Sequence, residues 1–198
     1  MRIGIIGAGN VGLALARGFA AADHDVVLGT RDPEKPAITE WLARAGDRGR
    51  AADYRATADS AELVIMAVPG RYVVDVAEAM GPDAFAGKIV VDVTNPIVPT
   101  ATGAVSAFGE EDSAAEALQR TLPGAYVVKA FNQISAEEMT SPSPDETRPL
   151  RIAGDHVPSK AIVASIASSF GWTVRDLGPL KRAGALERGV VEWFARQP

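Results

Sequence analysis

Three glycines near the N-terminus have the spacing of a phosphate-binding turn. Gly7, Gly9 and Gly12 follow the apolar run at residues 3–6, and helix-forming residues begin at Leu13. In this arrangement the first glycine makes a tight turn, the second lets a pyrophosphate approach the backbone, and the third lets the helix pack closely on the strand. The N-terminus of the helix then faces the anion. We therefore expect a dinucleotide across residues 7–12; the alternative is a glycine turn with a structural role only.

Thr30 and Arg31 stand at the end of the second expected strand, where sites of this kind contact the adenosine ribose. An NAD site has a carboxylate there for the 2'-hydroxyl, whereas an NADP site has a cation for the 2'-phosphate. Arginine binds phosphate through two parallel hydrogen bonds, and Lys35 follows one helical turn later. These residues predict NADP. Because Asp32 follows, the alternative that Arg31 is an ordinary surface arginine beside an aspartate stays open. We expect Asp32, however, to point outward and cap the helix that begins at Pro33.

Three later strand ends are expected to complete the site. Val68 and Pro69 would form a rigid apolar turn beside a nicotinamide, or a simple strand stop. Asn95 and Asn132 occupy equivalent ends of the next two strands, where their amides either bond a carboxamide or the edge of a second ring system, or cap the following turns. We assign the second substrate to Asn95, Pro96, Phe131 and Asn132.

The composition excludes several classes of chemistry. The 198 residues include no cysteine, and the two histidines, His24 and His156, lack partners spaced for a metal site or a triad. A net charge of -5 without a basic run argues against a nucleic-acid partner. No apolar stretch is long enough for a membrane span. Because the first strand begins at the N-terminus, we expect no signal peptide and a cytoplasmic protein.

Strands and helices alternate along the chain. This pattern predicts a Rossmann-type, doubly wound α/β fold, in which a mostly parallel sheet carries helices on both faces. We expect a single domain over residues 1–198, with a core at 1–138 and a closing βαβα extension of the same sheet at 150–198. Residues 97–112 are expected to form a long loop that covers the site, and residues 140–149 a proline-rich connector.

Nearly the whole chain resembles the NADPH-dependent reductases of coenzyme F-420, an 8-hydroxy-5-deazaflavin hydride carrier. The Lys-Ala-Phe-Asn segment is also similar to the reductase domain of six-transmembrane metalloreductases, which passes hydride from NADPH to a flavin. The resemblance rests on the glycine turn and on Gly29-Thr-Arg31, Val68-Pro69, Asp92-Val-Thr-Asn-Pro96, Val128-Lys-Ala-Phe-Asn132 and Gly178-Pro-Leu180.

The resemblance also implies roles for individual residues. One departure is that the family usually has an arginine shortly after Gly-Pro-Leu, where this chain has Lys181-Arg-Ala-Gly184; a second is that residues 190–198 are shorter than the family's hydrophobic C-terminal segment. The implied contacts are Ala8, Gly9, Asn10 and Val11 with the dinucleotide, Thr30, Arg31 and Lys35 with the 2'-phosphate, and Val68, Pro69 and Ala130 with the nicotinamide.

Hydride transfer between two cofactors agrees with the residues present. Dehydrogenases that act on hydroxyl groups need an acid or base such as His, Lys or Tyr, and we find no convincing one, so no catalytic residue is assigned. Transfer from NADPH to a deazaflavin or flavin requires stacking, orientation and exclusion of water. We therefore expect an NADP(H)-dependent oxidoreductase acting on F-420 or a flavin.

Two alternatives stay open. One is a small imine or hydroxyacid reductase, although such enzymes typically add a helical domain. The other is a non-catalytic module that binds NADP or senses redox state. The direction of transfer and the oligomeric state, a homodimer included, are also open.

Overall fold

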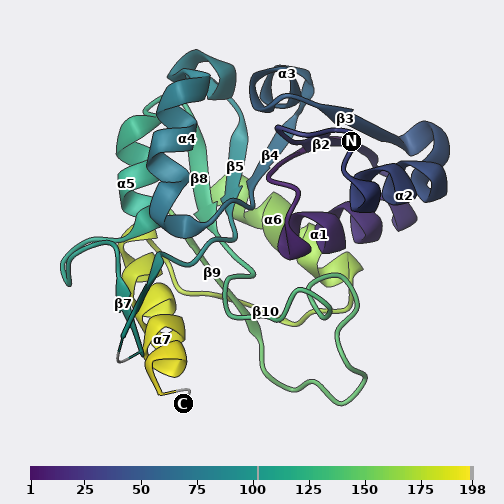
Figure 1. The fold of residues 1–198 in the computed structure, drawn as a ribbon. Helices are drawn as coiled ribbons and strands as arrows, with labels where there is room; N and C mark the ends of the chain where they lie inside the picture. The colour runs from purple at the N-terminus through teal and green to yellow at the C-terminus, as the bar shows by residue number, and fades with distance from the viewer. Residues whose placement is uncertain (102, 197–198) are drawn as a thin grey trace.

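The computed structural model describes residues 1–101 and 103–196 (Figure 1). Six strands of the main sheet run parallel to one another. They are β1 (Arg2–Ile6), β2 (Asp25–Gly29), β3 (Gly49–Ala52), β4 (Leu63–Met66), β5 (Ile89–Asp92) and β8 (Tyr126–Lys129). With β9 (Leu150–Gly154) and β10 (Val174–Asp176) they make an eight-stranded sheet in the order β10-β9-β8-β5-β4-β1-β2-β3. The predicted Rossmann-type fold is confirmed.

The closing strands extend this sheet but reverse its direction. β9 pairs antiparallel with β8, and β10 pairs parallel with β9. The carboxyl ends of the six parallel strands therefore lie at the same edge of the sheet as the first residues of β9 and β10. Residues from the closing segment can thus contribute to a site at this edge.

Helices cover both faces of the sheet, and each face buries a separate apolar core. Successive side chains of a strand point to opposite faces. Accordingly, Ile5 belongs to the core under α1 (Asn10–Ala21), α2 (Pro36–Ala45) and α6 (Val157–Ser169). Ile6 belongs to the core under α3 (Tyr54–Ser60), α4 (Val73–Met80), α5 (Ala114–Thr121) and the start of α7 (Ala183–Ala195). Burial on both faces explains why these strands are continuous apolar runs.

Short 3-10 helices link several of these elements. They are η1 (Gly46–Arg48), η2 (Gly70–Tyr72), η3 (Pro82–Phe85) and η4 (Leu180–Arg182). Among the described residues, no helix has both the length and the apolar character that a membrane crossing requires.

One helix prediction is corrected, and one helix was missed. Helix α2 begins at Pro36 and not at Pro33, because a residue that precedes proline is disfavoured in the helical conformation, and Lys35 has ψ 130°. The helix α3 was not predicted. Its N-cap is Asp53, whose carboxylate accepts a hydrogen bond of 2.8 Å from the Ala56 amide, so the signal was an aspartate at the start of a short helix.

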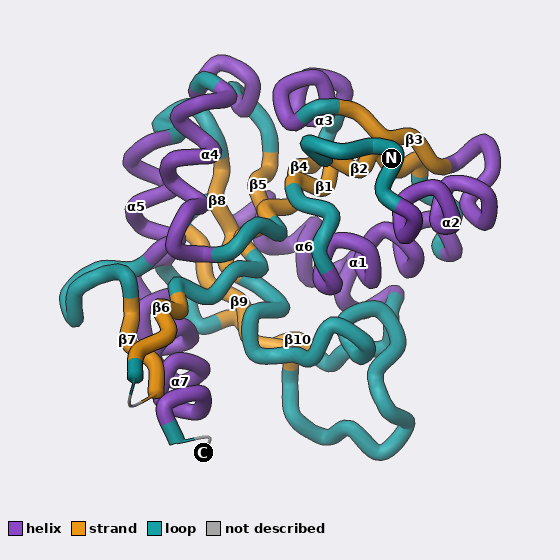
Figure 2. Tube along the Cα trace, in the orientation of Figure 1, coloured by secondary structure: helices purple, strands orange, loops and turns teal. Residues whose placement is uncertain are grey.

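The segment at residues 97–112 also differs from the prediction of a covering loop. It contains an antiparallel hairpin of β6 (Ile97–Thr100) and β7 (Gly103–Ser106). The hairpin lies beside α7 (Figure 1), and none of its residues lines the cavities described below. The long connection between β8 and β9 (Figure 2) instead contributes residues 133–136, 138, 139 and 148 to the lining of one of these cavities.

Candidate functional site

The glycine turn divides into two residues that the fold requires and one that faces open space. Gly7 has φ +116°, and a Cβ there would lie 2.6 Å from the Ala67 carbonyl oxygen. A Cβ on Gly12 would collide with the Gly7 carbonyl oxygen, so the close packing of helix on strand needs glycine at this position. By contrast, no atom lies within 4 Å of a Cβ placed on Gly9. The space in front of Gly9 is therefore available to a ligand.

The N-terminus of α1 is suited to an anion. Gly9 is its N-cap residue, no side chain caps it, and its first turn has no acidic residue. The first amide N–H groups of a helix have no intrahelical partner, and the helix dipole favours negative charge there. The turn can therefore bind a pyrophosphate as predicted.

A cleft begins at this turn and continues across β2 and β4. Its part at the glycine turn encloses about 850 Å³ and a neighbouring hollow about 1000 Å³, and the two share Thr30, Arg31, Tyr54, Val68 and Pro69. The hollow extends toward α4 and presents the apolar side chains of Val76 and Ala79. Its size and shape suit a ring system attached to the bound phosphates. The cleft brings together the predicted residues Gly7, Ala8, Gly9, Asn10, Val11, Thr30, Arg31, Lys35, Val68 and Pro69.

Arg31 is free to bind a ligand. It is exposed and has no hydrogen bond or ion pair with any residue that the structure describes. The hydroxyl of Thr30 accepts a hydrogen bond from the Asp32 amide at 3.0 Å, which fixes the turn. The Asp32 carboxylate accepts one from the Glu34 amide at 3.2 Å. The carboxylate therefore caps a turn and not the helix, because α2 begins four residues later. Asp32 also lines the cleft, so its predicted outward orientation stays a prediction.

A second cavity of about 720 Å³ shares Val11 with this cleft. Val93 is one of its lining residues, residues 133–136, 138 and 139 form one wall, and α7 forms another through Ala185, Leu186, Gly189 and Val190. Trp193 and Phe194 are half-exposed at the end of α7, with ring centroids 4.9 Å apart. Much of the lining is apolar. The cavity can therefore hold a flat ring close to the dinucleotide cleft.

Asn95 and Asn132 both line this second cavity. The Asn132 amide nitrogen donates to Asn95 Oδ1 at 2.9 Å and to the Leu186 carbonyl at 3.3 Å, while Asn95 Nδ2 donates to the Asn132 carbonyl at 2.7 Å. Both N–H groups of the Asn132 side-chain amide thus donate hydrogen bonds, whereas the Asn95 side-chain amide has one N–H group left for a ligand. Of the two residues, Asn95 has more capacity for a ligand, and Asn132 connects β8 to α7.

Three other predicted site residues are buried. Ala130, Pro96 and Phe131 line none of the cavities described here. Phe131 has φ +61°, a conformation that is uncommon for an aromatic residue and that turns the chain after β8. A contact from these residues to a ligand would have to come from their backbone.

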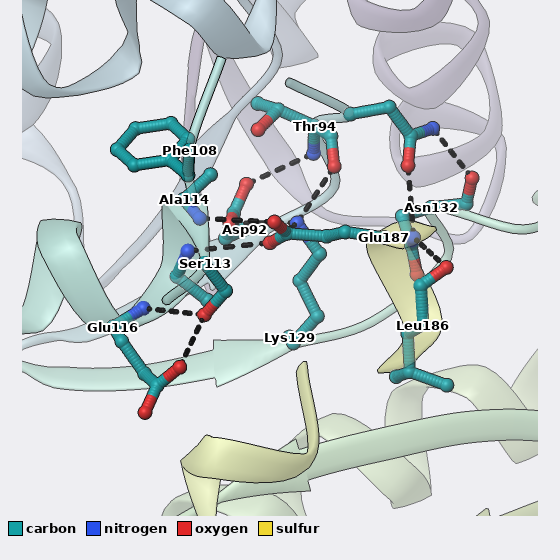
Figure 3. Close-up of polar contacts among 12 residues, drawn as sticks. Asp92, Thr94, Phe108, Ser113, Ala114, Glu116, Lys129, Asn132, Leu186 and Glu187 are labelled. Atoms are coloured by element: carbon teal, nitrogen blue, oxygen red, sulfur yellow. Dashed lines mark hydrogen bonds and ion pairs between the residues drawn. The ribbon is translucent and has the colours of Figure 1, made fainter. Parts of the chain in front are cut away.

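A buried charged cluster beside the asparagines was missed by sequence reasoning. Lys129 Nζ lies 2.9 Å from Asp92 Oδ2 and 2.7 Å from Glu187 Oε1, and donates to the Thr94 carbonyl at 2.6 Å (Figure 3). The other Glu187 oxygen accepts from the Ala114 amide at 2.9 Å, at the start of α5. The cluster therefore joins β5, β8, α5 and α7 behind the second cavity. The available signal was a lysine and an aspartate within apolar strand ends.

The burial of this cluster perturbs its titration. Removal from water raises the pKa of Glu187, Lys129 lowers it in part, and Asp92 raises it further. Burial by itself would lower the pKa of Lys129, but the two carboxylates outweigh that effect and raise it. The lysine thus stays charged, and burial together with the charge of Asp92 disfavours ionisation of Glu187. Within residues 1–101 and 103–196, no group of three or more His, Asp or Glu side chains is placed to hold a metal ion.

Known proteins are similar to this chain in sequence and in fold. The family model described as NADP oxidoreductase, coenzyme F420-dependent, matches residues 2–96. The F420-dependent NADP reductase of Methanothermobacter thermautotrophicus is 31% identical over 199 residues, which cover 95% of this chain and 85% of that reductase. The chain belongs to this family. Family membership places it among NADP-dependent oxidoreductases.

Two further comparisons extend the family match. A solved structure of a candidate F420-dependent NADP reductase from Arthrobacter sp. FB24 has a TM-score of 0.90 and 32% identity, covering 96% of this chain and 90% of that chain. Metalloreductase STEAP3 of Rattus norvegicus is 31% identical over 187 residues, which cover 94% of this chain and 36% of that protein. The chain thus spans about a third of the metalloreductase. Both resemblances found in the motifs are confirmed.

The departure from the family at Gly184 has a structural counterpart. A Cβ on Gly184 would lie 2.9 Å from Arg188 Nη1, so the guanidinium of Arg188 covers the glycine. Arg188 also donates to the Glu110 carbonyl at 2.8 Å. An arginine is thus present near this position, but it comes from one helical turn further along α7.

Proposed function

We propose that the protein transfers hydride between NADPH and the ring of a deazaflavin, coenzyme F-420, or of a flavin. The observation that carries the proposal is the meeting of the two cavities at Val11. One cavity begins at an anion-binding helix terminus, and the other offers an apolar space for a second ring. Two rings held in adjacent cavities satisfy the main requirement of hydride transfer, which is proximity and orientation.

The dinucleotide is proposed to lie with its pyrophosphate at residues 7–12 and its 2'-phosphate at Thr30, Arg31 and Lys35. Residues 7–11, Thr30, Arg31 and Lys35 line one cleft, and Arg31 and Lys35 are exposed toward solvent on the same loop. The nicotinamide would lie near Val68 and Pro69, on the side of the cleft that leads to Val11. NADP(H) supplies the hydride chemistry, and the protein supplies binding and exclusion of water.

The second cavity supports a ring acceptor over an alcohol or ketone. Its described lining contains no His, Lys or Tyr that could exchange a proton with a hydroxyl substrate, and its carboxylate, Glu138, already accepts a hydrogen bond of 3.0 Å from the Ser135 hydroxyl. A deazaflavin or flavin ring accepts the hydride on one ring atom and takes its proton from water. The residues of the cavity therefore need only orient the ring and keep it next to the nicotinamide.

The proposal is tested by mixing the purified protein with NADPH and, in separate reactions without oxygen, with F-420, FMN or riboflavin. We expect the acceptor absorbance to fall as NADPH is oxidised, with one NADPH consumed per acceptor. Gly9→Val is the control, because it should fold normally and lose NADPH binding. Binding of NADPH without reduction of any ring acceptor would contradict the proposal and support the non-catalytic alternative.

A further inference from the structure

Helix α7 forms one wall of the second cavity, although many of its residues there are small. The residues of α7 that line the cavity are Ala185, Leu186, Gly189, Val190, Trp193 and Phe194. The residues of α7 that are buried are Ala183, Gly184, Leu186, Glu187 and Val191. Alanine and glycine bury little apolar surface, and glycine inside a helix is unfavourable relative to alanine. The position of this wall must therefore depend on polar contacts as well.

Glu187 makes polar contacts that join α7 to two other elements. Its Oε1 lies 2.7 Å from Lys129 Nζ on β8 (Figure 3). Its Oε2 accepts a hydrogen bond of 2.9 Å from the Ala114 amide, and its Oε1 accepts one of 3.3 Å from the Ala115 amide. Ala114 and Ala115 begin α5, and the first N–H groups of a helix have no partner within it. One buried carboxylate therefore ties the cavity wall to both β8 and α5.

The same contact lies next to residues that face the cavity. Leu186, the neighbour of Glu187, lines the cavity, and its carbonyl accepts the hydrogen bond of 3.3 Å from the Asn132 amide. Lys129 is the last residue of β8 and the cross-strand partner of Asp92. A rotation or slide of α7 at Glu187 would thus move Leu186 and change the space beside Asn132.

The contact of Glu187 fixes a geometry more than it adds stability. A buried ion pair gains little net stability, because the lost hydration offsets the attraction, but its hydrogen bonds still select one arrangement. Here burial and the charge of Asp92 raise the pKa of Glu187, so its ionised form is disfavoured in the fold. A neutral side chain of the same size should therefore not destabilise the protein, since Lys129 keeps its ion pair of 2.9 Å with Asp92.

We infer that Glu187 is a positioning residue for the hydride acceptor, because its contacts with Lys129 and α5 hold α7 in the orientation that shapes the second cavity. The inference rests on the proposed function and adds to it what sets the shape of the acceptor site. Among the described residues, Glu187 lines neither the second cavity nor the dinucleotide cleft. It should therefore affect the affinity for the acceptor through α7 and leave the affinity for NADPH unchanged.

The test replaces Glu187 by glutamine, which keeps the size of the side chain. Its amide has an NH2 group in place of one oxygen, so either Lys129 or Ala114 would face another donor. We expect α7 to take up its productive position in only part of the molecules, which weakens acceptor binding by the same factor. For a productive fraction of about one tenth, KM and the dissociation constant for the acceptor rise about tenfold. The melting temperature should not fall, and the dissociation constant for NADPH should stay that of the wild type.

The acceptors are riboflavin, FMN and F-420. Binding is measured by quenching of their fluorescence, and turnover by absorbance with NADPH in the absence of oxygen. Riboflavin is uncharged, so it separates an effect of position from an effect of the lost negative charge behind the cavity. Glu187→Asp is the second variant, because it keeps the charge but is one methylene group too short to reach both Lys129 and α5. It should also raise KM for the acceptor, and a wild-type KM in this variant would assign the effect to charge and overturn the inference.

Glu192→Gln is the matched control. Glu192 lies on the same helix, is exposed and pairs with Arg196 at 3.4 Å, and it is not among the described residues that line the second cavity. The control removes the same charge from α7 without disturbing the contact with β8 and α5. KM for the acceptor should therefore stay that of the wild type.

The outcomes separate the inference from the proposed function. Turnover by the wild type, with an unchanged acceptor KM in Glu187→Gln, overturns the inference and leaves the proposed function intact. Equal weakening of acceptor and NADPH binding together with a lower melting temperature also overturns it, because Glu187 then has a general structural role. Failure of all three acceptors to bind or react overturns both proposals. Weaker acceptor binding in the two Glu187 variants, without turnover by the wild type, supports the positioning role and contradicts hydride transfer.

Discussion

Replacement of Arg31 by alanine should separate the affinities for NADPH and NADH. Arg31 has no hydrogen bond or ion pair with the described residues, so the substitution breaks no polar interaction among them. The 2'-phosphate of NADPH carries about -1.5 to -2 charges, and a hydrogen bond to a charged group contributes about 1.5–3 kcal/mol. The loss for NADPH should therefore be about ten- to hundredfold. NADH has a hydroxyl at this position and should bind almost as before.

The measurement is a titration of wild type and Arg31→Ala with both nucleotides, by calorimetry or by NADPH fluorescence. Salt should weaken NADPH binding to the wild type more than to the variant, because the phosphate contact is exposed and screened. Arg44→Ala removes an equally exposed arginine outside the cleft and serves as the control. A wild type that prefers NADH, or an equal loss for both nucleotides in Arg31→Ala, would refute the assignment of the 2'-phosphate site.

Four further predictions follow from the packing and the charges of the site. Gly9→Val should keep the melting temperature while abolishing NADPH binding, whereas Gly12→Ala should lower the free energy of unfolding by about 1–3 kcal/mol, because its Cβ meets backbone. Lys129→Met leaves two buried carboxylates unpaired and should cost about 3–5 kcal/mol in urea unfolding; a loss below 1 kcal/mol would contradict the ionised cluster. The pKa of Glu187 is raised from its usual 4.5, so the folded state holds the Glu187 proton more tightly than the unfolded state does. The contribution of Glu187 to stability therefore falls as pH rises from about 4.5 through the folded pKa. The stability of wild type relative to Glu187→Gln should fall over that range, and a constant difference would argue against the raised pKa. Asn132→Ala should reduce acceptor turnover more than NADPH binding, and an unchanged KM for the acceptor together with lowered stability would favour a purely structural role.

The nucleotide half of the site could be predicted from the sequence because its determinants are local. The positive φ of Gly7 and the contact of Gly12 with the turn involve residues only a few positions apart. The alternation of buried strands with amphipathic helices likewise sets the doubly wound fold. The errors at α2 and α3 were also local, since Lys35 before a proline and Asp53 as a cap were both visible in the sequence.

The acceptor half of the site depended on the tertiary structure. Lys129 meets Asp92 across a separation of 37 residues, and Glu187 joins them from α7, so their pairing follows from sheet order and helix packing. The reversed direction of β9 then places Arg151 at the edge where the parallel strands end. Strand direction is set by hydrogen bonds between residues far apart in the sequence, which leave no local pattern in the chain. The sequence by itself therefore determined where we propose that a dinucleotide binds, and only the tertiary structure decided which distant side chains surround the cavity proposed for the second ring.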